Sequence, residues 1–221
     1  MNEKINQISS KSRETILQNI KQKYKANDFK YIDTIDPVIH IKRDALEDSL
    51  SEMKRKMTDN KFIVEECNKD QLEDKINEIV LNYNYKKMIY GIGLKLNISK
   101  IKADEKICFD REIEDLRSEV FHSDFSIIHA KYGISTHGVV CVLSSKEQPR
   151  MLSLAPTLCI ILLEKEKVLN SLSEALNLVK KENETLPNNI LFIAGPSRTA
   201  DIELITVFGV HGPQKVHLIL Y

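Results

Sequence analysis

The sequence predicts an α/β fold with a mostly parallel sheet that is covered by helices on both faces. Short apolar runs rich in β-branched residues alternate with amphipathic stretches along most of the chain, as in proteins built from strand–helix–strand units. Several runs, such as TLCIILLE at 157–164, are apolar almost throughout, which is typical of strands buried on both sides. Hydrophobic residues make up 42% of the 221 residues, enough for the core of one domain.

Two helices are expected before the first strand. Apolar residues recur at helical spacing over 9–26 and over 45–59, and Pro37 interrupts the chain between them. We therefore expect an N-terminal helical segment at 1–58 and an α/β domain at 59–221. The two parts are expected to form one continuous globular unit.

Within the α/β domain, strands and helices alternate. The expected strands are 61–67, 86–93, 105–110, 157–164, 188–195 and 215–221, and the expected helices are 68–84, 111–123 and 167–184. The stretch 124–145 is rich in β-branched residues and interrupted by glycines, which predicts two strands joined by a turn. Because helices are sparse between about 125 and 163, we expect some antiparallel strand pairing there. The run SRTADIELITVFG at 197–209 is expected to form a helix or half-helix.

The composition excludes several classes of function. The 32 basic and 32 acidic residues cancel, which argues against a protein that binds nucleic acid through its overall charge. No run of about 18 apolar residues occurs, and the polar N-terminus has no apolar signal core, so we expect a cytoplasmic protein without a membrane span. The four cysteines are scattered without CxxC spacing, so no iron–sulfur cluster and no other metal site is expected in this chain.

The run GPSRTADIE that follows the strand at 190–194 is the first candidate site. A helix beginning here would direct free backbone N–H groups and its dipole at an anion, and an arginine would add a bidentate donor. The alternative is that glycine makes the turn, serine caps the helix, the acids complement the dipole, and nothing binds. The candidate anion-binding residues are Gly195, Ser197, Arg198, Thr199, Asp201 and Glu203.

A second candidate loop lies close to the end of the chain. Gly209 and Gly212 bracket His211, and a histidine flanked by glycines is typical of an exposed loop beside a ligand. The alternative is a tight connection from a helix to a strand, with the histidine facing solvent.

The run GISTHG at 133–138 supplies pocket candidates rather than a catalytic triad. Serine and histidine are both present, but no GxSxG elbow accompanies them. His129 and His137 make a weak metal site, since no partner acids accompany them, and polar positions on a strand are the alternative. The residues expected to line a pocket are Gly133, Thr136, His137 and Gly138.

Two shorter runs could also approach a ligand. RMLSLAP at 150–156 precedes a buried strand. It could contact a ligand, or it could be a surface turn with ordinary packing. GIG at 91–93 ends a strand and could let a ligand approach the backbone, or it could be a simple turn.

These motifs together resemble the lactate utilisation protein C family (LutC/YkgG type), which is built on the LUD domain. The run GPSRTADIE at 195–203 and the run GVHGP at 209–213 match the C-terminal signature of that family. The stretch 124–145 and the RMLSLAP run resemble the family upstream, so the similarity covers most of the chain.

The resemblance implies a three-layer α/β/α fold of the NagB/RpiA/CoA-transferase-like group. It also implies a subunit of an iron–sulfur L-lactate oxidation system that converts lactate to pyruvate and is linked to quinone or cytochrome. Two partner subunits would carry the clusters and could bring this chain to the inner face of the membrane. The chain itself would hold no cofactor and would bind a small carboxylate or phosphate ligand, or its partners.

One departure weighs against independent catalysis by this chain. The family run G-I-A-E-T-G-T is replaced by GISTHGV at 133–139, so the acid at position 136 is a threonine here. Two alternatives stay open: an independent enzyme of the same fold group that uses a nucleotide or CoA, and a purely structural or regulatory subunit.

Overall fold

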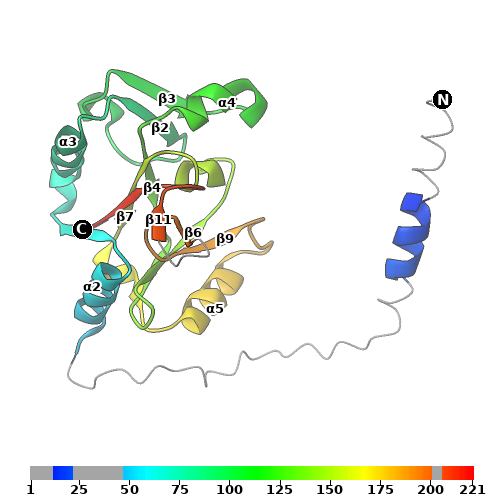
Figure 1. The fold of residues 1–221 in the computed structure, drawn as a ribbon. Helices are drawn as coiled ribbons and strands as arrows, with labels where there is room; N and C mark the ends of the chain where they lie inside the picture. The colour runs from blue at the N-terminus through cyan, green and yellow to red at the C-terminus, as the bar shows by residue number, and fades with distance from the viewer. Residues whose placement is uncertain (1–11, 22–46, 201–205) are drawn as a thin grey trace. The chain divides into compact units, whose positions relative to one another are not determined.

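The computed structural model describes residues 12–21, 47–200 and 206–221 (Figure 1). The chain divides into two units, Met1–Pro37 and Val38–Tyr221. In the first unit, residues 12–21 form a helix whose side chains are exposed, and the remainder of the helix expected at 9–26 lies outside the described residues. No helix in the described part of the chain combines the length and apolarity that crossing a bilayer would require.

The second unit is organised around a six-stranded parallel sheet. In spatial order its strands are β1 (Ile63–Glu66), β12 (Lys215–Leu220), β7 (Leu158–Leu163), β4 (Phe125–His129), β2 (Lys87–Gly91) and β3 (Glu105–Phe109). Every neighbouring pair is parallel, which confirms the predicted parallel sheet. The long runs of buried side chains in β4 and β7 follow from their central positions.

Helices cover both faces of this sheet, as the sequence predicted. On one face α3 (Leu72–Tyr83) packs Ile76 against Ile160 and its neighbours in one core cluster. On the other face α2 (Ser49–Asp59) and α4 (Ile113–Phe121) share a second cluster with Ile161. Met53 and Met57 of α2 are fully buried there, so this helix belongs to the folded core of the second unit.

A smaller mixed sheet lies on the α2 side and holds the antiparallel pairing. Its strands, in order, are β8 (Val168–Leu169), β5 (Tyr132–Ile134), β6 (Val139–Leu143) and β9 (Ile190–Ile193). The β5–β6 and β6–β9 pairs are antiparallel, and β5–β8 is parallel. The stretch 124–145 therefore contains three strands instead of the predicted two, and the strand expected at 188–195 joins this sheet and not the parallel one.

The α5 helix (Leu172–Glu182) closes the outer face of the smaller sheet. Ala175 and Val179 of α5 share an apolar cluster with Ile134 and Cys141 of the sheet. Ser171 caps the helix by accepting a hydrogen bond from the backbone N–H of Glu174. Short 3₁₀ turns complete the unit at η1 (Lys69–Gln71), η2 (Ile98–Lys100), η3 (Arg150–Ser153) and η4 (Lys165–Lys167).

The prediction of a helix or half-helix at 197–209 was wrong. The described residues form an antiparallel pair, β10 (Arg198–Ala200) and β11 (Thr206–Phe208). Threonine, valine and phenylalanine dominate the second strand, and these residue types favour extended backbone over helix. Residues 201–205, with Asp201 and Glu203, lie outside the described residues.

Candidate functional site

The strand order places a crevice at the carboxyl edge of the parallel sheet. The chain runs from β2 to β3 at one edge, then returns past β2 to β4 and continues through β7 to β12. The connections that leave β2 and β4 therefore head in opposite directions. In open α/β sheets, ligands bind in the crevice that such a reversal opens outside the carboxyl ends of the strands.

A cleft of about 500 Å³ lies at this point. Its lining comes from the segments that follow β2, β4, β7 and β12, from the loop after β6, and from η1. We call it the switch-point cleft and define it by Lys69, Gly93, Lys95, His129, Lys131, Glu147, Gln148, Glu164, Lys167 and Tyr221.

The charge of the switch-point cleft is positive on balance, because four lysines face two glutamates. Lys167 is paired with Glu164 at 2.9 Å. Lys131 pairs outside the lining set, with Glu182 at 2.6 Å. Lys69 and Lys95 are exposed and have no ion-pair partner among the residues that the structure describes. A concave site with this balance favours an anion.

His129 lies in the middle of this edge, at the end of β4. The side-chain amide of Gln148 makes two hydrogen bonds to the backbone of His129. The His129 N–H donates to Gln148 Oε1 at 2.8 Å, and Gln148 Nε2 donates to the His129 carbonyl at 3.0 Å. The ring Nε2 of His129 accepts a hydrogen bond from the backbone N–H of Lys95 at 3.3 Å, which leaves the proton on Nδ1. Burial, with Lys95 and Lys167 nearby, lowers the pKa of His129 and favours the neutral ring.

Glu164 and Tyr221 form the opposite side of the switch-point cleft, at the ends of β7 and β12. The hydrogen bond from Lys167 lowers the pKa of Glu164, so that carboxylate stays ionised. Burial, followed by the charge of Glu164, raises the pKa of the Tyr221 hydroxyl, which therefore stays protonated. The Tyr221 hydroxyl is also hydrogen-bonded to Glu164, so this side presents a fixed carboxylate with its own donor.

The GIG run has a packing role at this edge. The N–H of Gly93 donates to the Glu147 carbonyl at 3.0 Å, and a Cβ at Gly93 would lie 2.9 Å from Cβ of Glu147. Ser145 Oγ accepts the N–H groups of Glu147 and Gln148 at 3.2 and 3.0 Å and so shapes the loop. The glycines thus allow the loop that carries Gln148 to close over the end of β2.

The two C-terminal motifs meet at the opposite, amino edge of the sheet. The Ser197 N–H donates to the Pro213 carbonyl at 2.9 Å, and the Gly209 N–H donates to the Ser197 carbonyl at 2.9 Å. Gly212 packs against the Ser197 side chain. Both loops precede β12, which begins at Lys215, so they lie at the edge where parallel strands start. The GPSRT run does follow a strand, as expected, but that strand is β9, which pairs antiparallel with β6 in the smaller sheet and not in the parallel one.

A second cleft, of about 360 Å³, lies at this amino edge. His211 and Val210 of the GVHGP run line it together with Leu154 and Ala155 of the RMLSLAP run. Several large apolar side chains on or near this cleft are exposed: Phe121, Leu154, Val207, Phe208 and Val210. We call these residues, together with the strands β10 and β11, the amino-edge surface.

Arg198 does not stand at a helix N-terminus, so the predicted dipole-assisted anion site is absent from the described residues. Its guanidinium donates to the carbonyl of Ala194 at 2.8 Å and to that of Asn60 at 3.4 Å. Gly195 has a φ of +102°, and a side chain there would collide with the Asn60 carbonyl. Thr199 lies exposed in β10. Arg198 and Gly195 therefore brace the loop against the residue that ends α2.

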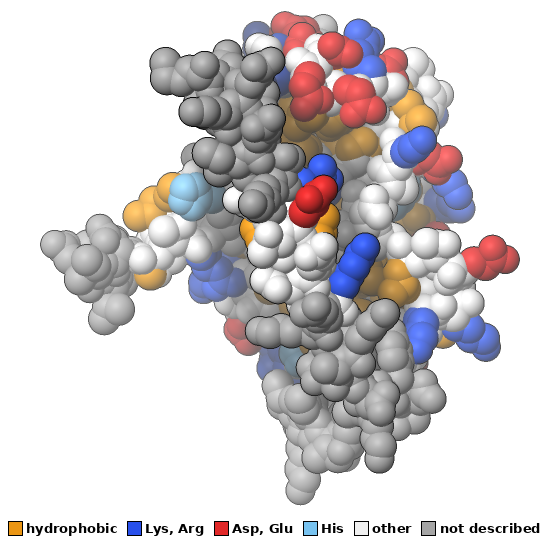
Figure 2. Space-filling model, turned by 90° about the vertical axis from the view of Figure 1, so that its right-hand side faces the viewer, with side chains coloured by type: hydrophobic (Ala, Val, Ile, Leu, Met, Phe, Trp, Pro, Cys, Tyr) orange, Lys and Arg blue, Asp and Glu red, His pale blue; other side chains and the backbone are white. Residues whose placement is uncertain are grey.

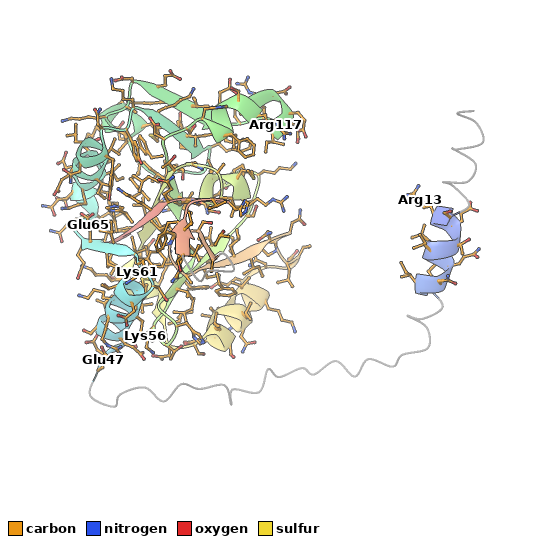
Figure 3. The ribbon with its side chains drawn as sticks, in the orientation of Figure 1. Arg13, Glu47, Lys56, Lys61, Glu65 and Arg117 are labelled. Atoms are coloured by element: carbon orange, nitrogen blue, oxygen red, sulfur yellow. The ribbon has the colours of Figure 1, made fainter. Side chains whose placement is uncertain are left out.

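The GISTHG run comprises the end of β5 and the turn that follows it. It packs against α2, and none of its residues lines either cleft. Thr136 donates to the Asn170 carbonyl at 2.7 Å and contacts His137 Nδ1 at 2.9 Å. Lys56 of α2, labelled in Figure 3, donates to the Thr136 carbonyl at 2.7 Å. Gly133 and Gly138 leave no room for a Cβ, because Met53 and the backbone of α2 lie against them.

Asn60 connects the predicted segments and was missed by sequence reasoning. Its Nδ2 donates to the carbonyls of His137 and Gly138, each at 3.0 Å, and its own carbonyl accepts from Arg198. No motif contains this residue. The lysines of the switch-point cleft were missed for a different reason: each follows a strand or lies in a short turn, but only the strand order brings them together.

The fold defines an open α/β protein of the parallel-sheet class, with a basic cleft at its topological switch point. The model of the LUD domain matches residues 50–221. The chain therefore belongs to the LUD-domain family, as the sequence motifs indicated.

Three proteins from other bacteria are similar to this chain in sequence. YkgG of Escherichia coli is 40% identical over 107 residues, which cover 47% of this chain and 46% of YkgG. A protein named NMB1437 from Neisseria meningitidis is 37% identical over 113 residues, covering 51% of this chain and 48% of that protein. In these two matches the chain spans about half the length of the relative. Lactate utilization protein C of Halalkalibacterium halodurans is 29% identical over 219 residues and 94% of its length.

A solved structure supports the fold. A DUF162 family protein from Deinococcus radiodurans superposes with a TM-score of 0.57 at 15% identity, covering 78% of this chain and 95% of that one. At this identity the similarity concerns the fold alone.

Proposed function

We propose that this chain acts in lactate utilisation as a LUD-domain subunit that binds an anionic ligand in the switch-point cleft. The names of the Halalkalibacterium halodurans and Bacillus subtilis relatives, both lactate utilization protein C, support the process. The observation that carries the binding role is the cleft itself, where four lysines and a neutral histidine surround the carboxyl ends of β2, β4 and β7.

In this proposal the electrons of L-lactate oxidation pass through iron–sulfur clusters in two partner subunits. The four cysteines of this chain lie apart in four different segments, and two of them, Cys141 and Cys159, are buried. They do not offer the grouped thiolates that a cluster requires. The part proposed for this chain is to bind the anion and to hold the assembly together, without its own redox centre.

The amino-edge surface is proposed as the face that meets the partners. Val207, Phe208 and Val210 are exposed there, beside Ser197, Arg198 and His211 of the two C-terminal motifs. Exposed apolar side chains rimmed by polar ones are typical of protein–protein contacts. On the face shown in Figure 2, acidic and basic side chains are interspersed, which suits a surface exposed to water.

Lactate-dependent dye reduction by the assembled subunits tests the proposed function. Extracts from a strain that lacks this chain are expected to lose the activity, and the wild-type chain should restore it. Lys95→Glu should restore little activity yet still co-purify with the partners, because the change lies in the switch-point cleft. Val207→Asp should weaken co-purification. Full activity without the chain would refute the proposal.

A further inference from the structure

We infer that the switch-point cleft takes a phosphorylated organic anion of about nucleotide size, and not lactate or pyruvate themselves. This inference rests on the proposed anion-binding role of the cleft and names the class of ligand. It follows from the volume of the cleft, the number and origin of its lysines, and its apolar wall.

The volume is too large for a three-carbon acid. The cleft is half open to solvent, and its volume of about 500 Å³ is many times that of one water molecule, about 30 Å³. A carboxylate with six non-hydrogen atoms would displace only a few water molecules and would leave most of the wall hydrated. Clefts of this volume are typical of sites that enclose drug-sized or cofactor-sized molecules.

The two lysines without a carboxylate partner among the described residues, Lys69 and Lys95, can together meet the charge of a phosphate group. Lys69 comes from η1, Lys95 follows β2, Lys131 follows β4, and Lys167 ends η4, so the four ammonium groups reach the cleft from four segments. Only Lys131 and Lys167 have carboxylate partners among the described residues. A phosphate group carries more charge and more acceptor oxygens than a single carboxylate.

The remaining lining suits the organic part of such a ligand. Leu72, Leu143 and Pro187 supply apolar wall to the same cleft. Beside them, the protonated Nδ1 of His129 can donate to a neutral oxygen or nitrogen acceptor. The cleft therefore combines a polyanion-binding rim with a wall that can contact an uncharged body.

Isothermal titration of the full chain tests this inference. The probes are ATP, coenzyme A, tripolyphosphate, L-lactate and pyruvate, each without added metal, at low and physiological salt. ATP or coenzyme A is expected to bind at least about tenfold more tightly than either carboxylate, and the affinity should fall as salt rises. Comparing ATP with coenzyme A distinguishes a nucleoside polyphosphate from a longer phosphorylated body.

Single lysine variants locate the site. Lys95→Ala and Lys69→Ala should each weaken binding of the organic phosphate by about tenfold, since each removes one charged contact. Lys102→Ala is the matched control, because Lys102 is an exposed lysine that does not line the switch-point cleft. Equal losses in all three variants would overturn the location.

Three results would overturn the ligand class: no binding of either organic phosphate, tighter binding of lactate or pyruvate, or tripolyphosphate binding as tightly as ATP. The first two results leave the proposed role in lactate utilisation standing if the strain that lacks this chain has lost lactate-dependent dye reduction. Retained dye reduction in that strain refutes the proposed function independently of any titration.

Discussion

Replacing Asn60 with alanine tests how the α2 helix holds two distant segments of the second unit. The side chain of Asn60 donates two hydrogen bonds, each of 3.0 Å, to the carbonyls of His137 and Gly138. Alanine removes both donors at a half-buried position and leaves two acceptors without this partner. At about 1 kcal/mol for each hydrogen bond, we expect a loss of about 2 kcal/mol in the free energy of unfolding.

Thermal unfolding followed by circular dichroism measures this loss. For a domain of this size, about 2 kcal/mol corresponds to a decrease in Tm of roughly 4–8 °C. Asn60→Asp should be less stable still, because a carboxylate would face two carbonyl oxygens. The matched control is Asn188→Ala, an exposed asparagine before β9, which should change Tm little. A melting temperature of Asn60→Ala within about 1 °C of wild type, or an Asn60→Asp variant as stable as Asn60→Ala, would refute the reasoning.

Two further predictions concern titration. Because the pKa of His129 is lowered, the folded state binds fewer protons than the unfolded state. The contribution of His129 to the free energy of unfolding is therefore complete above about pH 6.5 and is lost as the pH falls through the folded pKa. Urea unfolding should therefore show stability falling from pH 7 to pH 5, and less steeply in His129→Asn; an equal slope in this variant and in the wild type would contradict the reasoning. Burial raises the pKa of Cys141 to about 11 and of Cys159 to about 12, so iodoacetamide at pH 8 should label both only after unfolding; mass spectrometry showing equal labelling of the native protein would contradict this.

The parallel sheet could be predicted because its signal is local. Runs such as the one that became β7 are apolar throughout, and that pattern alone indicates a strand with both faces covered. The helices α3 and α5 were predicted for the same reason, since their buried residues repeat at helical spacing.

Strand partners were not predictable in the same way. The strand β9 has the composition of a parallel core strand but pairs with β6 in the smaller sheet, where its side chains pack against the clusters of both α5 and α2. The paired strands β10 and β11 were expected to be a helix, since glycine, proline and serine mark a turn before either element. The switch-point cleft depends on which strands are neighbours, so no single motif contains it.

The pairing of β1 has a consequence for how the chain is made. Its partner in the sheet is β12, and Ile63 lies opposite His217, more than 150 residues further along the chain. A nascent chain must therefore carry β1 with an open edge until almost all of the second unit has been synthesised. Contacts of such long sequence separation slow folding and leave strand edges exposed in the meantime. Addition of β1 to the central sheet is thus a late event that waits for β12, the strand that lies between β1 and β7.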